Sequence, residues 1–194
     1  MDFLSNHTYH IYNQGNRRQE IFYKKNDYLR FLTLTRKYIL PYCNILSYCL
    51  MPNHFHFLIH TTEDSISPKK IGNIMSTQLS NGFRMLQSSY AQVINTELGE
   101  YGSLFKQKAK AKLIDETSDH LFHAFTYVHQ NPLVAGLVTL IEEWEYSSYP
   151  DFAGLRNGTL CNIELAMQLL GLTREELFVE VQKPLSEKII QSFY

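Results

Sequence analysis

The stretch at residues 51–60 (MPNHFHFLIH) constrains the fold of this chain more than any other. Its run of aromatic and β-branched residues is typical of a buried β-strand. Side chains on a strand alternate between the two faces of a sheet. His54 and His56 therefore point to one face, while Phe55 and Phe57 point to the other. The Cα atoms of the two histidines lie about 6.6 Å apart on such a strand, which is within reach of one divalent ion.

The other hydrophobic periodicities predict an alternation of strands and helices. In chain order we expect a strand, a helix, two strands joined as a hairpin, a long helix, a strand and a helix, at residues 7–12, 27–39, 44–50, 54–61, 67–98, 103–114 and 115–131. Pro132 should end the last helix. The first six elements form the split βαβ repeat of a ferredoxin-like sandwich. We therefore predict an α+β fold, with a four-stranded antiparallel sheet and helices on one face.

A chain of 194 residues has room for one main domain and a small appendage. We place the main domain at residues 1–156 and a short helical C-terminal tail at residues 157–194. In the tail, Asn162 is the expected N-cap of a helix and Gly171 its stop. The three cysteines form no C-x-x-C pair, which predicts reduced thiols in a cytoplasmic protein. No apolar run is long enough for a membrane span.

The net charge of −1 argues against a simple electrostatic binder of nucleic acid, but basic residues cluster locally. Lysines recur at every second residue of the strand expected at residues 103–114, so that strand would present one basic face. These lysines are Lys106, Lys108, Lys110 and Lys112. A second cluster contains Arg17 and Arg18. The lysines are either DNA contacts or the charges that protect an edge strand from aggregation, and the arginines are either DNA contacts or part of a solvated turn.

Polar residues also share one face of the helix expected at residues 115–131. They follow one another at spacings of three or four and are His120, His123, Tyr127 and Asn131. If this face crosses the strand of His54 and His56, the amide oxygen of Asn131 completes a set of three metal ligands. Tyr127 then stands beside the ion. His123, one turn before Tyr127, is a candidate proton acceptor.

A metal-assisted tyrosine is suited to attack on a phosphodiester. Tyrosine has a pKa of about 10, so only about one phenol in a thousand is ionised at pH 7. A divalent ion polarises the phosphoryl oxygen and orients the phosphate for in-line attack. Simpler interpretations exist for each residue. Two histidines on a strand also occur as packed or solvated side chains, and Asn131 before a proline is also an ordinary helix terminator.

Four motifs of this chain resemble those of single-tyrosine HUH transposases, closest to the REP-associated tyrosine transposases. The PNHFH segment at residues 52–56 resembles the motif of two histidines around a hydrophobic residue. The other three motifs are INTELGEYGSLFKQKAK at residues 94–110, YVHQNPLVAGLV at 127–138 and WEYSSY at 144–149. They follow one another in the order of the family and leave only the tail uncovered.

The resemblance implies a fold, a reaction and a set of site residues. The implied fold is the ferredoxin-like sandwich. His54, His56 and Asn131 would hold Mg²⁺ or Mn²⁺, and Tyr127 would be the nucleophile. The implied function is that of a DNA transposase, usually a homodimer. Such an enzyme cleaves and rejoins single-stranded DNA hairpins through a covalent 5′-phosphotyrosine intermediate.

Two other functions are compatible with the same residues. A ferredoxin-like sheet can bind single-stranded nucleic acid through stacking aromatic residues, without catalysis. Such a module would keep its affinity for single strands and would not bind manganese. A metal-dependent hydrolase on the same scaffold would release its product and leave no DNA attached to the protein.

Overall fold

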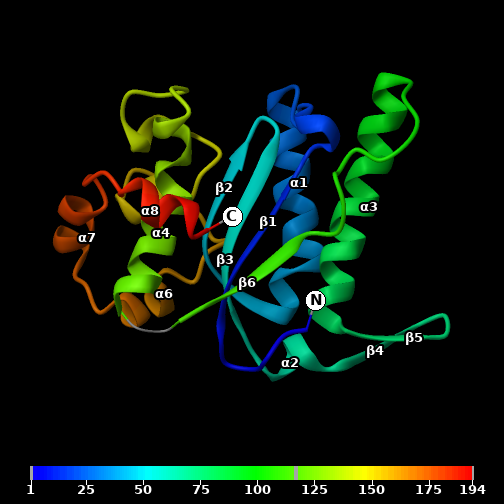
Figure 1. Cartoon of the computed structure of the whole chain (residues 1–194), viewed down its shortest axis with the longest axis horizontal. Helices are drawn as coiled ribbons and strands as arrows, with labels where there is room; N and C mark the ends of the chain where they lie inside the picture. Colours follow the sequence, from blue (N-terminus) through cyan, green and yellow to red (C-terminus); the bar gives the residue numbers. More distant parts are fainter. Residues whose placement is uncertain (1, 116–117, 194) are drawn as a thin grey trace.

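A four-stranded antiparallel sheet forms the centre of the molecule. The computed structural model describes residues 2–115 and 118–193, and its main sheet has the strand order β2-β3-β1-β6 (Figure 1). The strands are β1 (Thr8–Gln14), β2 (Cys43–Met51), β3 (His54–Thr61) and β6 (Lys110–Ile114). Each neighbouring pair is antiparallel. This is the order of a split βαβ repeat, so the predicted ferredoxin-like sheet is confirmed.

Two long helices cover the first face of the sheet, as predicted. They are α1 (Lys25–Tyr38) and α3 (Gln78–Leu98) (Figure 1). Side chains alternate along β3, so Phe55 and Phe57 both reach this face, where they are fully buried. The ring of Phe31 on α1 packs 5.1 Å from that of Phe55. Burial of one such side chain contributes about 1.5–3 kcal/mol, so this core holds the two helices on the sheet.

The two helices approach each other closely at Gly82. A β-carbon at this position of α3 would lie 2.2 Å from the carbonyl oxygen of Tyr38, the last residue of α1. Glycine in a helix interior costs about 0.5–1 kcal/mol relative to alanine. That cost is accepted here because only a hydrogen atom fits between the two backbones.

The opposite face of the sheet is covered by α4 (Ser118–Val134) and by helices of the C-terminal tail (Figure 1). Phe125 and Val128 of α4 belong to a buried cluster that also contains Leu58 of β3. The tail helices are α6 (Ile163–Leu170), α7 (Arg174–Glu180) and α8 (Glu187–Gln191). The helix was expected to begin at residue 115, but residues 116 and 117 lie outside the described residues.

The predicted end of α4 is wrong, because the helix continues through Pro132 to Val134. A proline removes one hydrogen bond from a helix, because it has no N–H donor. Donors beyond Pro132 are paired, since Ala135 N donates to Asn131 O at 3.0 Å and Leu137 N donates to Pro132 O at 2.9 Å. The proline therefore falls in the last turn, where the loss of one hydrogen bond does not stop the helix.

The first helix of the tail, α6, begins and ends at the predicted residues. The side chain of Asn162 accepts a hydrogen bond from Leu165 N at 3.0 Å, and Gly171 adopts φ +65° at the C-terminal end of α6. Ala166 and Leu170 of this helix are buried in the same cluster as α4. The tail therefore packs on the sheet, while the division of the chain after residue 156 stays a prediction.

The prediction of a long helix at residues 67–98 is wrong for its first eleven residues. Pro68–Ile71 and Ile74–Thr77 form the antiparallel strands β4 and β5 of a protruding hairpin (Figure 1). α3 begins only after Thr77, whose hydroxyl accepts a hydrogen bond from Ser80 N at 3.2 Å. The apolar residues of this stretch matched a helical stripe by spacing alone. Ile74 is in fact 71% exposed, so no buried surface stabilises a helix there.

The basic strand expected at residues 103–114 is also shorter than predicted. Only Lys110–Ile114 pairs with β1. Leu104 and Phe105 are both buried in the core beneath α1 and α3, and two adjacent residues of a regular strand cannot point to the same face. Residues 103–109 therefore form an irregular segment that crosses the rim of the core before the strand begins.

Short elements complete the chain. They are α2 (Glu63–Ile66), α5 (Tyr149–Phe152) and the 3₁₀ turns η1 (Asn16–Arg18), η2 (Leu40–Tyr42) and η3 (Ile141–Glu143). Within the described residues, no helix has the length and apolar character needed to cross a bilayer. Cys43, Cys49 and Cys161 are free thiols, as the sequence predicted.

Candidate active site

The two histidines of the 51–60 stretch lie side by side on β3. Their ring centroids are 4.9 Å apart, and both side chains point to the face that carries α4. His56 is only 1% exposed, and His54 is partly buried. The alternation of the strand therefore places both imidazoles as the sequence predicted. It also places them beside the buried cluster beneath α4, to which Leu58 of the same strand belongs.

Each of these rings uses one nitrogen for a hydrogen bond and keeps the other available. His54 Nδ1 lies 2.6 Å from Asn53 Oδ1, and His56 Nδ1 lies 2.8 Å from His10 Nε2. The Nε2 atoms of both His54 and His56 are buried, and neither has a hydrogen-bond partner among the described residues. A buried, unpaired ring nitrogen is costly, and ligation of a metal ion by both Nε2 atoms would satisfy the two together.

Burial also keeps both imidazoles neutral. It lowers the pKa of His54 to about 4, although the neighbouring polar side chain of Asn131 opposes this effect. Burial, together with the neighbouring His54 and His10, lowers the pKa of His56 well below its ordinary value of 6.5. Only a neutral imidazole can ligate a metal. The site is thus in the protonation state that ligation needs at neutral pH.

The helix α4 brings Tyr127 and Asn131 to these histidines. The ring of Tyr127 lies 5.4 Å from that of His56 in an edge-to-face arrangement. Asn131 is one turn further along, and its Nδ2 donates to Tyr127 O at 2.6 Å. This bond uses the amide nitrogen of Asn131 and leaves its oxygen available as a ligand. The structure therefore brings His54, His56, Tyr127 and Asn131 together, while their roles as metal ligands and nucleophile stay predictions.

The donors of this site are two imidazoles and one amide. Among residues 2–115 and 118–193, no group of three or more His, Cys, Asp or Glu side chains could hold a metal ion. A metal at this site would thus depend on Asn131 as the third protein ligand. Mixed nitrogen and oxygen donors suit divalent ions that keep several water or phosphate ligands.

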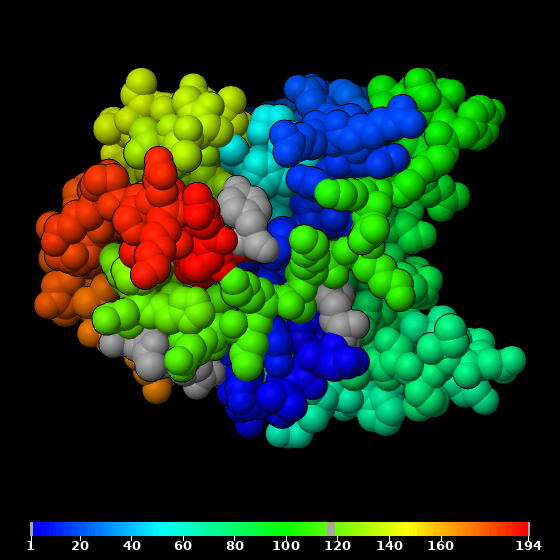
Figure 2. Space-filling model, viewed as in Figure 1, coloured from blue at the N-terminus to red at the C-terminus, as the bar shows by residue number. Residues whose placement is uncertain are grey.

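The C-terminal segment covers the Tyr127 side of the site. Tyr127 is 5% exposed, and the ring of Phe193 stacks on it with centroids 5.0 Å apart. Figure 2 shows the last helices, drawn in red, over the green surface of α4. The Nζ of Lys112 donates to the carbonyl oxygen of Ser192. Lys112 therefore holds the C-terminal segment in this structure.

A basic cavity of about 660 Å³ opens beside the two histidines. Four of its lining residues are cations expected to bind DNA, namely Arg18, Lys106, Lys108 and Lys110, and His54 and His56 lie in its wall. The Nζ of Lys110 lies 5.5 Å from the ring centre of Tyr12. Arg17 is exposed in the adjoining turn η1. The cavity gathers positive charge from distant segments, which the net charge of the chain conceals.

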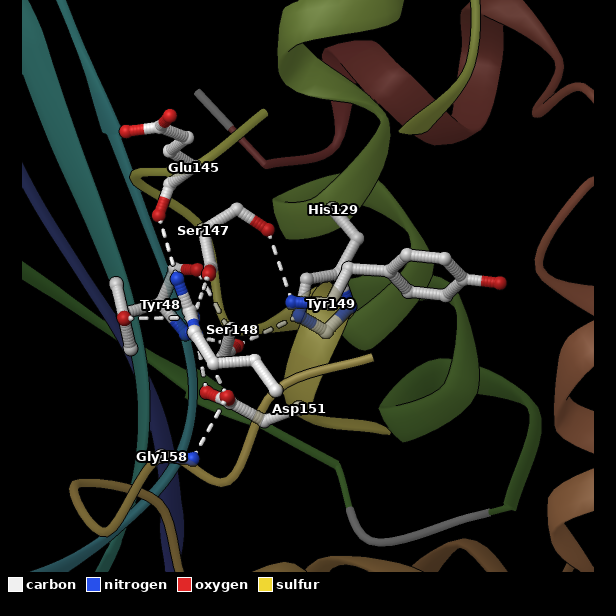
Figure 3. Close-up of polar contacts among 9 residues, drawn as sticks. Tyr48, His129, Glu145, Ser147, Ser148, Tyr149, Asp151 and Gly158 are labelled. Atoms are coloured by element: carbon white, nitrogen blue, oxygen red, sulfur yellow. Dashed lines mark hydrogen bonds and ion pairs between the residues drawn. The ribbon is translucent and has the colours of Figure 1, made fainter. Parts of the chain in front are cut away.

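Residues 144–151, which we call the 144–151 segment, fasten α4 to the edge of the sheet. The segment runs along β2, where Ser148 N donates to Tyr48 O at 3.0 Å and Tyr48 N donates to Ser148 Oγ at 2.9 Å. Ser148 Oγ also shares a 2.7 Å hydrogen bond with Nε2 of His129, which is buried on α4 (Figure 3). The segment thus covers the open edge of β2 and is hydrogen-bonded to α4 at His129, two residues after Tyr127.

An ion pair holds the 144–151 segment in shape. Asp151 is buried and accepts hydrogen bonds from Arg156 Nε at 2.7 Å and from Gly158 N at 2.9 Å (Figure 3). The Arg156 guanidinium in turn donates to the carbonyl oxygens of Glu145 and Ser147 at 2.7 and 2.6 Å. The WEYSSY motif therefore has a structural role, which is to position α4.

Comparison with known families gives the affiliation of the chain. The family model described as "Transposase IS200 like" matches residues 3–131, which is more than half of the sequence. The chain belongs to the IS200-like transposase family. The matched range includes both histidines, Tyr127 and Asn131. Membership indicates a DNA-cleaving enzyme with a role in transposition. A comparison with curated proteins found no match.

One solved structure similar to this IS200-like transposase confirms its fold. A REP-associated tyrosine transposase bound to a REP hairpin is 17% identical, and the alignment covers 84% of this chain and 87% of that chain with a TM-score of 0.57. A bacterial tRNA(His) guanylyltransferase-like protein aligns with a TM-score of 0.41 in its complexes with GTP and ATP. In these two complexes the identity is 10% and 9%, and the coverage is 71% and 74% of this chain and 70% of each of those chains.

Two further histidines, His123 of α4 and His10 of β1, lie on elements that form the site. His123 is half-buried on α4, with its ring 6.2 Å from that of Phe122, and its role as proton acceptor stays a prediction. His10 escaped the sequence analysis although it contacts His56. It lies in β1, where the strand pattern places it on the same face as Tyr12. Only the pairing of β1 with β3 shows that His10 lies on the same face of the sheet as His54 and His56.

Proposed function

We propose that this IS200-like transposase cleaves and rejoins single-stranded DNA through a covalent 5′-phosphotyrosine intermediate on Tyr127. The observation that supports the proposal most is the position of the Tyr127 ring, 5.4 Å from that of His56. Next to it lie two buried Nε2 atoms, of His54 and His56, that have no partner among the described residues. A tyrosine beside two imidazole nitrogens that can ligate a metal is the arrangement that metal-assisted attack on a phosphodiester needs.

In the proposed reaction, the phenol oxygen of Tyr127 attacks the scissile phosphorus. The bond from phosphorus to the 3′ oxygen breaks, and the proton lost by the phenol is balanced by the one gained at the released 3′-hydroxyl. His123, one turn away, is the candidate acceptor that would first take this proton. Rejoining is the reverse reaction, in which another 3′-hydroxyl attacks the phosphotyrosine. The phosphodiester energy is conserved because no water enters.

His54, His56 and Asn131 are the residues that would hold Mg²⁺ or Mn²⁺ in this proposal. When bound there, the ion would polarise the phosphoryl oxygens and lower the cost of ionising Tyr127, which is about 4 kcal/mol at pH 7 for a free phenol. The residues fit the ion because both imidazoles are neutral and their Nε2 atoms lack partners. The bond from Asn131 Nδ2 to Tyr127 O occupies the amide nitrogen, so the amide oxygen is the atom that would serve as the ligand.

We further propose that the DNA backbone enters through the basic cavity. Arg18, Lys106, Lys108 and Lys110 line it, and each phosphate neutralised by such cations releases counterions, which makes binding dependent on salt. The similar REP-associated transposase is bound to a REP hairpin, and a hairpin with a single-stranded flank is the substrate we propose here. Arg17 and Lys112 extend the same basic surface, although Lys112 contacts the C-terminal segment in this structure.

The experiment is an adduct assay. A labelled hairpin with a single-stranded flank is incubated with the protein and Mn²⁺, and the mixture is separated on a denaturing gel. Wild type is expected to yield a labelled protein band, and Tyr127→Phe is expected to yield none. Tyr101→Phe is the matched control, because Tyr101 is 99% exposed and outside the site. An adduct in Tyr127→Phe at the wild-type level would refute the assigned nucleophile.

Other results of the same assay would point to the alternative functions. Released product without a labelled protein band would indicate a hydrolase. A gel shift with the single strand, combined with neither cleavage nor manganese binding, would indicate a binding module. We also propose a homodimer in the cytoplasm, and light scattering during gel filtration tests the oligomeric state directly.

A further inference from the structure

His10 has an environment that suggests a defined role in the site. It is fully buried in β1, and its Nε2 lies 2.8 Å from Nδ1 of His56. In the register of the sheet, Tyr12 is opposite His56 and His10 is opposite Leu58, so His10 and His56 are diagonal neighbours. Their rings stack with centroids 5.0 Å apart and an interplanar angle of 14°. Two histidines are thus locked together by geometry on adjacent central strands.

We propose that His10 is a positioning residue that sets the tautomer and the orientation of the His56 ring for metal ligation. This inference rests on the proposed function, because it assigns His10 a part in the same metal site. A neutral imidazole carries one proton. A lone pair on Nε2 of His56 therefore requires the proton on Nδ1. His10 Nε2 is the acceptor that holds this proton at Nδ1, so the Nε2 lone pair of His56 remains directed into the site.

The packing around His10 leaves the pair little freedom. The ring of Tyr12 stacks on that of His10 with centroids 4.9 Å apart, and the ring of Tyr127 meets His10 edge to face at 5.7 Å. Phe193 closes a further side at 6.0 Å. Since the proposed nucleophile Tyr127 and the proposed metal ligand His56 both contact His10, a change in the His10 ring would affect both.

The hydrogen bond between His10 and His56 has a parallel at the other proposed imidazole ligand, which supports a role beyond packing. His54 has a comparable arrangement, since its Nδ1 lies 2.6 Å from Asn53 Oδ1 while its Nε2 is unpaired. In both proposed imidazole ligands, Nδ1 is therefore hydrogen-bonded to a neighbouring side chain, and Nε2 has no hydrogen-bond partner among the described residues. Outer partners of this kind fix ring orientation in metal sites, and their loss costs about 10–100-fold in metal affinity.

The first test measures Mn²⁺ affinity in the protein without DNA, by calorimetry and by electron paramagnetic resonance. His10→Leu is expected to weaken binding about 10–100-fold, and His10→Gln to restore most of it, because the glutamine Oε1 can accept the proton from His56 Nδ1. His60→Leu is the matched control on the same face of β3. Wild-type affinity in His10→Leu, or equal losses in the leucine and glutamine variants, would overturn the assignment.

The second test needs neither metal nor a folded variant. Nitrogen-15 NMR of the wild-type imidazoles distinguishes a proton on Nδ1 from one on Nε2, and His56 is expected to carry it on Nδ1. A proton on Nε2 of His56 would overturn the role of His10 even if the transposase forms its adduct. Failure of wild type to bind Mn²⁺ would instead contradict the metal site of the proposed function, and the NMR result would still decide the tautomer.

Discussion

The hydrogen bonds of Ser148 allow a quantitative prediction about how α4 is held. The change is Ser148→Ala, which removes one buried oxygen and creates no large cavity. That oxygen accepts from Tyr48 N at 2.9 Å, shares a 2.7 Å bond with His129 Nε2 and donates to Tyr48 O at 3.3 Å. Tyr48 O keeps a partner in the variant, because Ser148 N also donates to it at 3.0 Å.

Two buried groups lose their partner in this variant. They are the amide N–H of Tyr48 and the ring nitrogen Nε2 of His129. The other ring nitrogen of His129 already lacks a partner within the described part of the chain, so the imidazole would retain no hydrogen bond. A buried polar group left without a partner costs about 1–3 kcal/mol. We therefore expect Ser148→Ala to reduce the free energy of unfolding by about 4 kcal/mol, the middle of the summed range of about 2–6 kcal/mol.

Urea denaturation measures this loss, followed by circular dichroism and by the fluorescence of Trp144, the only tryptophan in the sequence. A second variant, His129→Phe, tests the cause. Its ring would lie among the rings of Phe125 and Phe152 and needs no hydrogen bond. The double variant should be more stable than the sum of the two losses predicts, by about 1–2 kcal/mol. A loss below 1 kcal/mol in Ser148→Ala, or strict additivity, would refute the reasoning.

Three further predictions concern packing, pH and metal. Gly82→Ala should destabilise the protein by about 1–3 kcal/mol in urea denaturation, although alanine favours helix, because its β-carbon would meet Tyr38 O; a stabilised variant would contradict the close approach of α1 and α3. Burial raises the pKa of all three thiols, that of Cys161 to about 12. The unfolded chain therefore loses these protons first, and stability should fall as pH rises above about 8.5, by about 1.4 kcal/mol per pH unit for each thiol. Cys161→Ala should remove one such contribution from the slope between pH 8.5 and 10, and an unchanged slope would contradict the burial of its thiol. Mn²⁺ at one hundred times its Kd should stabilise wild type by about 2.7 kcal/mol in a thermal shift assay, and the double variant His54→Ala, His56→Ala should show no shift.

Local patterns in the sequence were sufficient for the strands and for the position of the two histidines. Alternation along residues 54–61 placed His54 and His56 on the face opposite to Phe55 and Phe57, and the structure has that arrangement. The spacing of Tyr127 and Asn131 placed both on one face of α4. These predictions succeeded because the period of a strand or a helix is a property of the local backbone, which the sequence shows directly.

Predictions from periodicity were wrong where the side chains are not buried in the predicted pattern. Residues 68–77 have helical spacing, yet Ile74 and Met75 are exposed and the segment forms a hairpin. Lysine alternates with other residues from position 106 to position 112, but Leu104 and Phe105 are both buried in the core and residues 103–109 are irregular. In both segments, the observed structure depends on whether the apolar side chains pack against other parts of the chain.

The partners of the site residues came only from the tertiary structure. His10 meets His56 because β1 and β3 pair in one register, and Phe193 meets Tyr127 because the tail folds back over α4. Ser148 reaches His129 because the 144–151 segment follows the edge of β2. The sequence by itself determined which side chains share a face of one element. Which faces meet depends on packing between segments far apart in the chain, and no local period encodes that choice.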